Sequence, residues 1–582
     1  MTITVLIADP DYFKLRLPNA IWLASGLHEG AVKALHRSPS CDQAERICRE
    51  IGDATLLRLV LKDQRLVRID AWRGITTGFE IFYAQRPDGS ILISDHFRHL
   101  LAEIPVAERR SSDLAVLEHL LFRAVTAPET YAHGVKRLAH GERLSIDAAS
   151  NAVEVSQFDR IDYEWQGGST RDYLDRLDNS LAEAVGWFGR RKDIAAFFSG
   201  GIDSTLVQTY LPKDISALFF APESVNPGTP DPLRYARRAA ELLDMKLEVE
   251  RLRDEETWAN LESNIDLAGW PQRVIQTTMY ARGYQHAAGG FIQGGRGDAL
   301  FGAAGTRAAV LANKAKSRPL TAMLELADRI HVSGADRVRR LLDASRRMAK
   351  APDSPEGWAA GMSSVGYTDF PALVDAVGAE LLSERYAGRI EYAKTRLGPA
   401  TDSASHLARH LELAHWIDYW LEDATAFARQ LALGHGKRVH MPFLAGPLVA
   451  AAMTVPVEQR YIRGLDVKYL LKGALKRRLP TYSIHQKKGI TSMRVPPRYK
   501  GEDRAAVWEE YPLPSLIPDR HRERIMSFRS PMSFCALTYA MLDRRVLRNA
   551  QLPRLAAKER IEFSAGMIYQ PEEQRGQRVR RG

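Results

Sequence analysis

The sequence predicts an α/β protein, in which a β-rich α+β domain precedes a domain built on a parallel sheet with a large helical portion. A length of 582 residues is more than one hydrophobic core normally supports, so at least two domains are expected. Residues 1–160 contain short apolar runs parted by turn signals, which is typical of antiparallel strands. Residues 161–555 alternate apolar strands with amphipathic helices, which indicates a parallel sheet with helices on both faces.

The spacing of apolar residues places the individual elements. In the first domain, strands are expected at 3–7, 78–84 and 91–94, with a turn at 86–90. In the second domain, helices are expected at 173–188 and 232–243, and strands at 194–198, 215–220, 247–252 and 291–293. Residues 315–480 are predicted to be mainly helical. Residues 556–582 are polar and charged, and we expect them to form a disordered basic tail.

The composition narrows the class of protein. No stretch approaches the roughly 20 apolar residues of a membrane span, and the first residues lack the basic-then-apolar plan of a signal peptide. We therefore expect a cytoplasmic protein without a membrane span. Cys41, Cys48 and Cys535 lack the spacing of a zinc site or a disulfide framework. The net charge of +10 permits an anionic partner, but the Arg clusters are typical of solvated faces, so no nucleic-acid partner is expected.

A glycine loop, SGGIDS at 199–204, follows the strand expected at 194–198. Open α/β sheets bind ligands at the carboxyl ends of their strands, and glycines there let the backbone approach a phosphate. The loop lacks the Lys of G-x-x-x-x-G-K-[ST] and the spacing of G-x-G-x-x-G. It carries Asp203 instead, and a carboxylate beside phosphate makes sense if Mg²⁺ lies between them. The alternative is an ordinary strand-to-helix turn with Asp203 as the N-cap.

These residues resemble the S-G-G-x-D-S pyrophosphate loop of the ATP pyrophosphatase superfamily, whose members cleave ATP between the α and β phosphates and adenylate a carbonyl or carboxyl oxygen. Later stretches are similar to the asparagine-synthetase-like branch. The matching stretches are GVKRLAHG at 134–141 (G-x-x-R-L-P-P-G), QGGRGDALFG at 293–302 (S-G-E-G-S-D-E-x-F-G), MPFL at 441–444 (P-F-L), KYLL at 468–471 (K-x-L-L), LP at 479–480 and HQKKG at 485–489 (R-x-K-x-G). The resemblance covers nearly the whole chain. It implies a degenerate glutaminase-like domain over 1–160 and an ATP-pyrophosphatase domain over 161–555.

The resemblance also implies roles for single residues. Asp203 and Asp298 would hold Mg²⁺ on the pyrophosphate of ATP, which suits two carboxylates at separate strand ends. Lys487 would stabilise the charged transition state, with Lys488 as its rival, and Lys468 would lie near the pyrophosphate. The residues implied to bind ATP or pyrophosphate are Phe198, Ser199, Gly200, Gly201, Asp203, Ser204, Gln293 and Gly294, with Gly294 and the Phe198 backbone at the adenine or ribose end.

Three departures from the family pattern bear on the reaction. Asparagine synthetases begin with a cysteine that hydrolyses glutamine, whereas this chain has Thr2 in that place. A ligase without this ammonia source must use an amine of its own substrate, as β-lactam or carbapenam synthetases and lasso peptide cyclases do. β-Lactam synthetases carry a Tyr, acting with a downstream Glu, where this chain has Gly295. Ala299 stands where the synthetases have Glu. A position without a side chain leaves room for a folded peptide, which favours the cyclase.

The hypothesis is therefore an ATP-dependent macrolactam synthetase of lasso peptide biosynthesis. It would adenylate an Asp or Glu side chain of a precursor peptide and join it to the peptide's N-terminal amine, releasing AMP and pyrophosphate. ATP would be the co-substrate, Mg²⁺ the cofactor, the leader-cleaved precursor peptide the substrate and a leader peptidase the partner. The alternatives left open are a β-lactam or carbapenam synthetase, a glutamine-independent asparagine-synthetase-like ligase, and a non-catalytic escort that binds the peptide.

Overall fold

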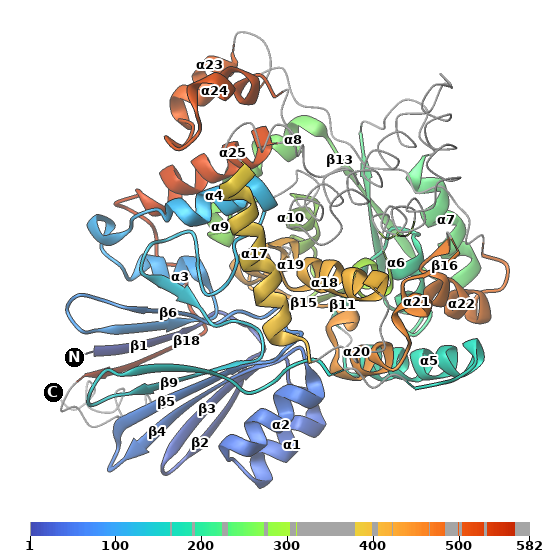
Figure 1. Ribbon diagram of the computed structural model, residues 1–582, viewed down its shortest axis with the longest axis horizontal. Helices are drawn as coiled ribbons and strands as arrows, with labels where there is room; N and C mark the ends of the chain where they lie inside the picture. The colour runs from blue at the N-terminus through green and yellow to red at the C-terminus, as the bar shows by residue number, and fades with distance from the viewer. Residues whose placement is uncertain are drawn as a thin grey trace.

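The computed structural model describes residues 2–162, 166–188, 193–223, 231–272, 278–302, 306, 310, 379–398, 406–421, 423–464, 466–482, 499, 503–528 and 532–564. Figure 1 shows two β-sheets packed face to face on one side of the molecule and a third, parallel sheet surrounded by helices on the other. The predicted α/β class with a parallel sheet and many helices is confirmed. No helix in these described segments is both long and apolar enough to cross a membrane.

The first domain has four layers. One sheet is antiparallel with the order β10-β9-β5-β4-β3-β2, and the other has the order β18-β1-β7-β6-β8, in which only β1 and β7 pair in parallel. The strands are β1 (Thr2–Ile7), β2 (Phe13–Leu17), β3 (Ala20–Ser25), β4 (Thr55–Lys62), β5 (Arg65–Arg73), β6 (Phe82–Gln85), β7 (Ile91–Ser94), β8 (Val135–Arg137), β9 (Glu142–Asp147), β10 (Val153–Gln157) and β18 (Glu559–Ser564). The helices are α1 (Glu29–Arg37), α2 (Cys41–Ile51), α3 (Phe97–Ala102) and α4 (Asp113–Phe122), with a short 3₁₀ turn at Val106–Glu108.

Side chains alternate between the two faces of each strand, and this alternation decides which layer each residue packs into. Leu57 and Leu59 of β4 lie in the core between the two sheets, whereas Leu56 faces the opposite side and packs with Trp22, Trp72 and the helices α1 and α2. Successive side chains of a strand point to opposite faces, so one strand serves two cores. Phe82 and Leu92 turn away from the inter-sheet core toward α3 and α4, which lie on the side of the second domain.

The expected tail from residue 556 is wrong for its first part. Glu559–Ser564 forms β18, which pairs antiparallel with β1 from Thr2↔Ser564 to Ile7↔Glu559. Ile561 and Phe563 enter the inter-sheet core, and Glu559 accepts hydrogen bonds from the Tyr12 hydroxyl and the Lys14 ammonium. The chain thus returns after the second domain to complete a sheet of the first, so the boundary expected at 555/556 does not separate a folded part from a tail. Residues 565–582 lie outside the described residues.

The second domain contains the predicted parallel sheet, in the order β13-β12-β11-β14-β15. Its strands are β11 (Ile194–Phe197), β12 (Ala217–Pro222), β13 (Leu247–Leu252), β14 (Gly290–Gln293) and β15 (Arg438–His440). The helix at 232–243 and the strand at 247–252 form with the predicted bounds, as α7 and β13. The strand expected at 215–220 begins and ends two residues later, as β12. Every residue of β11 and β14 is buried, as expected for strands covered on both faces.

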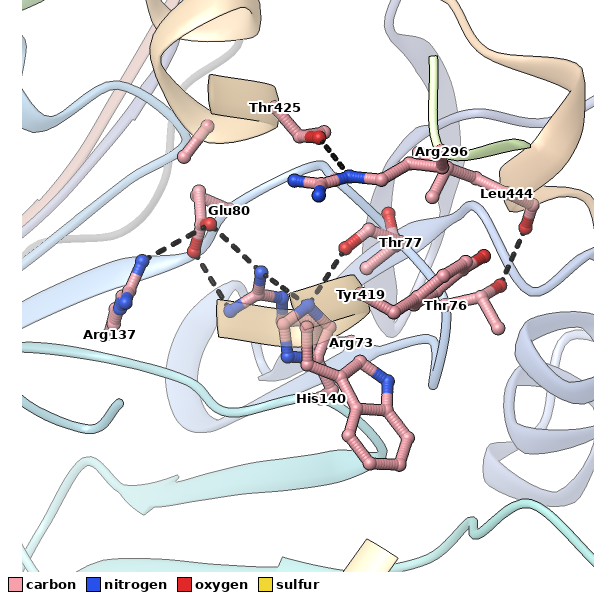
Figure 2. Close-up of a pocket in the computed structure, with 13 residues that line it drawn as sticks. Arg73, Thr76, Thr77, Glu80, Arg137, His140, Arg296, Tyr419, Thr425 and Leu444 are labelled. Carbon is pink, nitrogen blue, oxygen red and sulfur yellow. Dashed lines mark hydrogen bonds and ion pairs between the residues drawn. The ribbon is translucent and has the colours of Figure 1, made fainter. Parts of the chain in front are cut away.

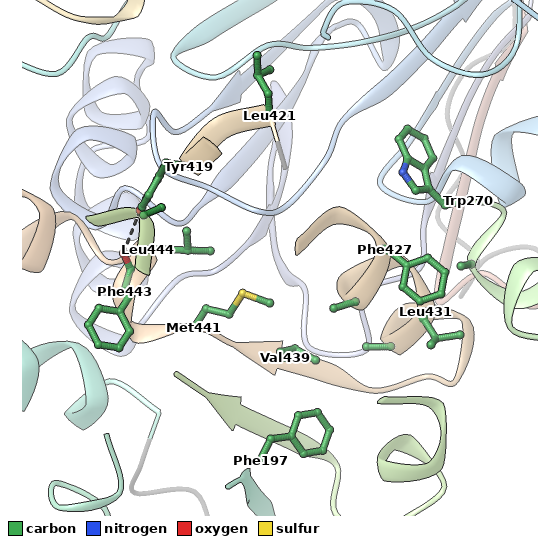
Figure 3. Packing of buried hydrophobic residues seen from close by; sticks show 14 of the residues in the cluster. Phe197, Trp270, Tyr419, Leu421, Phe427, Leu431, Val439, Met441, Phe443 and Leu444 are labelled. Carbon is green, nitrogen blue, oxygen red and sulfur yellow. Dashed lines mark hydrogen bonds between the residues drawn. The ribbon is translucent and has the colours of Figure 1, made fainter. Parts of the chain in front are cut away.

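The second domain also contains many helices. In chain order they are α5 (Thr170–Gly186), α6 (Ile202–Gln208), α7 (Pro232–Leu243), α8 (Asp254–Ala259), α9 (Leu261–Ala268), α10 (Thr278–Tyr284), α11 (Gly297–Phe301), α17 (Ala379–Arg396), α18 (His406–Leu421), α19 (Asp423–Gly434), α20 (Gly446–Met453), α21 (Val457–Arg460), α22 (Tyr469–Arg478), α23 (Arg504–Glu510), α24 (Asp519–Met526) and α25 (Met532–Leu542). A short 3₁₀ turn (Pro442–Leu444), a π-helical turn (Asp543–Leu547) and a hairpin of β16 (Ile462–Arg463) and β17 (Asp466–Val467) complete the described elements. Figure 3 shows Phe197 of β11, Val439 of β15 and the following Met441 in the core of this domain.

The two domains share a polar and tightly bonded contact. Arg429 of α19 donates two hydrogen bonds to the Asp53 carboxylate, at 2.8 and 2.5 Å, and its guanidinium lies 3.9 Å from the centre of the Phe79 ring. The Trp420 indole donates to the Ile75 carbonyl at 2.8 Å. Because Arg429, Trp420 and Phe79 are buried and Asp53 is largely so, the contact fixes α18 and α19 against the first domain.

Candidate functional site at the ends of β11 and β14

The site lies where the order of the parallel strands reverses. From β11 the chain builds β12 and β13 on one side, then crosses back to place β14 on the other side of β11. Such a switch point leaves a crevice at the carboxyl ends of the two strands, because the connections leave in opposite directions. Phe197 ends β11 directly opposite Gln293, the end of β14, so the two glycine-rich loops start side by side.

The first loop is held by its own hydroxyls. The Ser199 and Ser204 hydroxyl oxygens lie 3.0 Å apart, Ser204 Oγ accepts the Ser199 N–H at 3.2 Å, and Ser199 Oγ accepts the Gly201 N–H at 3.3 Å. Gly200 has φ of +63°, and a Cβ there would lie 2.6 Å from the Ala236 nitrogen of α7. Glycine is therefore required at 200 both by the left-handed backbone and by the close approach of α7.

Asp203 is not the N-cap of the helix that follows. Gly201 occupies that position without a side-chain cap, and Asp203 lies inside the first turn of α6. The N-cap role considered for Asp203 is therefore wrong, and its carboxylate pairs with Lys468 instead. Phe198, in contrast, buries its side chain, and its backbone N–H donates to the Leu218 carbonyl of β12 at 2.9 Å.

The second loop packs directly on Asp203. A Cβ on Gly294 would lie 2.8 Å from the Asp203 carbonyl carbon, and one on Gly297 would lie 2.9 Å from its carboxyl carbon. The atoms close to Gly294 are backbone and cannot move aside, so this position needs glycine for steric reasons, whereas a Cβ on Gly297 would displace the Asp203 carboxylate. Gly295 differs, because its nearest neighbour would be the Met441 sulfur at 3.7 Å, which is an ordinary contact.

A lysine joins the two loops. Lys468 Nζ lies 2.5 Å from Asp203 Oδ2 and also contacts Asp298 Oδ1. The lysine and Asp203 side chains are largely buried, whereas that of Asp298 is 56% exposed. Burial alone would lower the pKa of Lys468, but the charges of Asp203 and Asp298 outweigh it and raise the pKa above its ordinary value. Three residues that are far apart in the sequence thus form one ion-paired group, with Lys468 and Asp203 largely buried and Asp298 at its exposed edge.

The sequence missed several residues that shape this group. The Tyr482 hydroxyl donates to the Gly200 carbonyl, and Tyr482 is buried. Arg296, with φ of +76°, lies just before α11 and donates from Nε to the Thr425 hydroxyl at 2.5 Å. Gly297 belongs to the same sequence motif as Gly294, so the motif could have indicated that Gly297 is part of the site. Nothing local to Thr425 indicates its contact with a loop 129 residues away.

Lys487 and Lys488 lie outside the described residues. Their implied role at the transition state therefore stays a prediction, as do the nucleotide-binding roles of the loop residues. Within the segments that the structure describes, no group of three or more His, Cys, Asp or Glu side chains could hold a metal ion. A cation at Asp203 and Asp298 would therefore need further ligands from water or from phosphate oxygens, which is usual for Mg²⁺.

A polar cavity between the domains adjoins the second loop (Figure 2). The Glu80 carboxylate pairs with the Arg73 guanidinium at 2.8 Å and with that of Arg137 at 3.5 Å. Burial, aided by Arg73, holds the pKa of His140 well below its ordinary value, so this ring is neutral. Arg296 reaches the same cavity from the second loop. Its volume is about 20 Å³, which suits an ordered water and not a substrate.

Comparison with known proteins identifies the family of this chain. A search of curated proteins finds no match. Among solved structures, NMN synthetase from Francisella tularensis is similar at 18% identity with a TM-score of 0.16, over 21% of this chain and 49% of that chain. This chain thus spans about half the length of that structure, and the likeness is too low to bear on the fold. The asparagine synthase family matches residues 176–511, which include both loops, Lys468 and more than half of the 582 residues. This protein belongs to the asparagine synthase family.

Proposed function

We propose that this protein is an ATP-dependent lasso peptide cyclase. It adenylates an Asp or Glu side chain of a precursor peptide and closes a macrocyclic isopeptide bond with the peptide's N-terminal amine. Membership of the asparagine synthase family supports the broader class, an ATP-dependent ligase that forms carbon–nitrogen bonds. The choice of a peptide substrate and of ring closure is supported instead by details of the site.

The convergence of Asp203 and Asp298 supports the use of ATP and a divalent cation. The Lys468 ammonium contacts both carboxylates, so a cation position common to the two already exists in the fold. The residues therefore fit Mg²⁺, whose preferred ligands are carboxylate and phosphate oxygens. When bound, Mg²⁺ neutralises charge on the phosphates during cleavage between the α and β phosphates. Asp203 and Asp298 would hold it there, and the glycines at 200, 294 and 297 keep side chains out of the crevice.

Gly295 is the observation that carries the choice of a peptide. A Cβ at this position would meet no atom closer than 3.7 Å, so the fold does not require glycine there. A Cβ would make only ordinary contacts with Met441 and Gln293, so a side chain would fit there and its absence leaves that space to a substrate. A small, enclosed substrate would gain nothing from this space, whereas a folded peptide needs it. The position also offers no group that could deprotonate an amine.

The chain's cysteines do not supply an alternative nucleophile for glutamine hydrolysis. Cys48 and Cys535 are buried, and Cys41 lies half-buried on α2, where its sulfur accepts from the Arg58 guanidinium. Strand β1 carries no cysteine and pairs along its length with β18. The attacking amine is therefore assigned to the peptide itself.

The proposed reaction has two balanced steps. A carboxylate oxygen of the peptide attacks the α-phosphorus of ATP, and pyrophosphate leaves with the cleaved oxygen. The peptide's α-amine then attacks the acyl carbon, AMP leaves with the former carboxylate oxygen, and the amine nitrogen loses a proton. An α-amine with a reference pKa of about 8 is partly neutral near pH 7, so the absence of a side-chain base at 295 is no obstacle. Positioning of amine and acyl carbon would supply most of the remaining acceleration.

The test is incubation of the full-length protein with a leader-cleaved core peptide, ATP and Mg²⁺. We expect AMP, pyrophosphate and a product lighter than the peptide by one water, with a protease-resistant ring seen by tandem mass spectrometry. Release of ADP would contradict the proposal. Binding of the peptide without any AMP would instead favour a non-catalytic escort, and AMP release only with a small amino acid derivative would favour a β-lactam or carbapenam synthetase. Addition of a leader peptidase to the full precursor would show whether that partner is needed.

A further inference from the structure

Lys468 occupies the position that a metal ion bound by both carboxylates would need. Its ammonium contacts Asp203 Oδ2 and Asp298 Oδ1, which come from two different helices, α6 and α11. Mg²⁺ takes carboxylate oxygens at about 2.0–2.1 Å. An ammonium and a divalent cation cannot both lie against the same two oxygens, because they repel each other strongly at such a distance.

The fold holds Lys468 in this position. Its backbone has φ of +59°, in the left-handed region that is uncommon for lysine, at the residue just before α22. Its N–H donates to the Tyr461 carbonyl at 3.4 Å. That same carbonyl lies against Gly302, where a Cβ would come within 2.3 Å of it. Because Gly302 ends the helix that carries Asp298, the lysine and that carboxylate are fixed to each other through Tyr461.

We infer that Lys468 is an internal counter-ion that excludes free divalent cations from the Asp203–Asp298 pair, so that the metal enters only together with the nucleotide. Displacement of the ammonium by a free metal ion costs the largely buried lysine charge its contacts with Asp203 and Asp298, which is unfavourable. A metal–nucleotide complex brings phosphate oxygens that receive the displaced ammonium. Metal and nucleotide binding are then coupled through one side chain. This inference rests on the proposed use of ATP and a metal by the same site.

The same helix provides a matched control. Lys472 lies one turn after Lys468 on α22, has nearly the same exposure, 11% against 12%, and also pairs with an aspartate, Asp466. Removing either lysine changes the net charge by the same amount. Only removal of Lys468 takes away an ammonium that contacts both Asp203 and Asp298.

The experiment measures Mn²⁺ binding to the full-length protein by electron paramagnetic resonance, with and without α,β-methylene-ATP, which cannot be cleaved between those phosphates. For the unmodified protein we expect weak Mn²⁺ binding alone and at least ten-fold tighter binding with the analogue. In Lys468→Met, the Kd for Mn²⁺ alone should fall at least ten-fold and the effect of the analogue should shrink. Lys472→Met should behave like the unmodified protein. Circular dichroism checks folding, and Lys468→Gln serves as the second variant if Lys468→Met does not fold.

The outcomes separate this inference from the proposed function. If Mn²⁺ alone binds Lys468→Met no tighter than the unmodified protein, Lys468 is not a competing counter-ion, even if the analogue still promotes binding. If the unmodified protein binds no Mn²⁺ with the analogue, the proposed use of ATP and a metal fails, and this inference with it. Asp203→Asn must abolish tight Mn²⁺ binding both in the otherwise unmodified protein and in combination with Lys468→Met. If tight binding persists, the bound ion lies elsewhere and the inference is wrong.

Discussion

Gly294 and Asp203 lie so close that a Cβ on the glycine would come within 2.8 Å of the aspartate's carbonyl carbon. This contact joins the loop after β14 to the first turn of the helix after β11. It sets how far the two halves of the crevice stand apart, and hence whether the carboxylates of Asp203 and Asp298 can share one cation.

Gly294→Ala should therefore disable the site although it adds only a methyl group. The new Cβ must push the loop away from α6, because the nearest atoms are backbone and cannot rotate aside. We expect the rate of peptide-dependent AMP release to fall by about 100-fold, as for loss of a stabilising group at the transition state. Gly388→Ala on α17 is the control, since a Cβ there meets no atom within 4 Å, and its adenylation rate should stay within a factor of about two. Equal losses in both variants would show that the steric argument is wrong.

Asp203→Asn and Asp298→Asn should each lower pyrophosphate release by at least about 100-fold, because an amide keeps the shape of the side chain but loses the charge that binds a hard cation. The measurement is pyrophosphate release at saturating peptide over a range of Mg²⁺ concentrations. Asp231→Asn is a suitable control, because Asp231 caps α7 by accepting the Leu233 N–H and asparagine caps equally well. Full activity in Asp298→Asn would remove that residue from the site.

The sequence predicted the convergence of Asp203 and Asp298 better than the position of Lys468 between them. Asp203 and Asp298 each follow a buried strand, and parallel strands bring their carboxyl ends to one edge, so their convergence could be expected. The pairing of Lys468 with both could not be read in this way, because it comes from a left-handed residue 265 positions after Asp203. Its place depends on the packing of the β16–β17 hairpin against Gly302, which has no local signal.

The missed strand β18 has a different cause. Its sequence, ERIEFS, carries apolar residues only at Ile561 and Phe563, and alternation over six residues looks polar when charged residues fill the other face. Composition therefore indicated a tail. Pairing with β1 and burial in the inter-sheet core supply what the local sequence lacks.

Deletion of residues 557–582 should destabilise the first domain and promote aggregation. It removes two buried apolar side chains and exposes the edge of β1, whose unpaired backbone can then pair with other chains. Deletion of 565–582 keeps β18 and serves as the control. We expect a lower unfolding midpoint and light scattering at lower temperature only for the longer deletion. Identical melting of both deletions would show that β18 contributes nothing to stability.

Asp53→Ala should weaken the contact between the domains. It leaves the Arg429 guanidinium buried, with a side chain only 3% exposed, and without its bidentate partner. Breaking such a buried pair from one side costs about 3–5 kcal/mol. We expect a clear fall in the unfolding midpoint measured by calorimetry. Lys33→Ala breaks an exposed pair on α1 and should leave the midpoint unchanged, so a similar fall in both variants would contradict the assignment.

Asp95 should make the protein less stable as the pH rises from about 4 to about 7. Burial, together with the neighbouring charge of Asp9, raises the pKa of this carboxyl from 3.8 to about 7, against the opposing effect of hydrogen bonds from the Ala8 and Asp9 N–H groups. Between these values the folded protein keeps a proton that the unfolded chain has lost, so raising the pH favours unfolding, by up to roughly 4 kcal/mol in total. His119 and His415 act in the opposite direction, because burial lowers the pKa of each to about 3 and the unfolded chain takes up protons below pH 6.5.

The Asp95 contribution is therefore measured as a difference, from urea unfolding of the unmodified protein and Asp95→Asn at pH 5 and pH 7.5. The variant should lose less stability, or gain more, than the unmodified protein between these two values. The same change in both proteins would mean that Asp95 ionises at its ordinary pKa in the folded state.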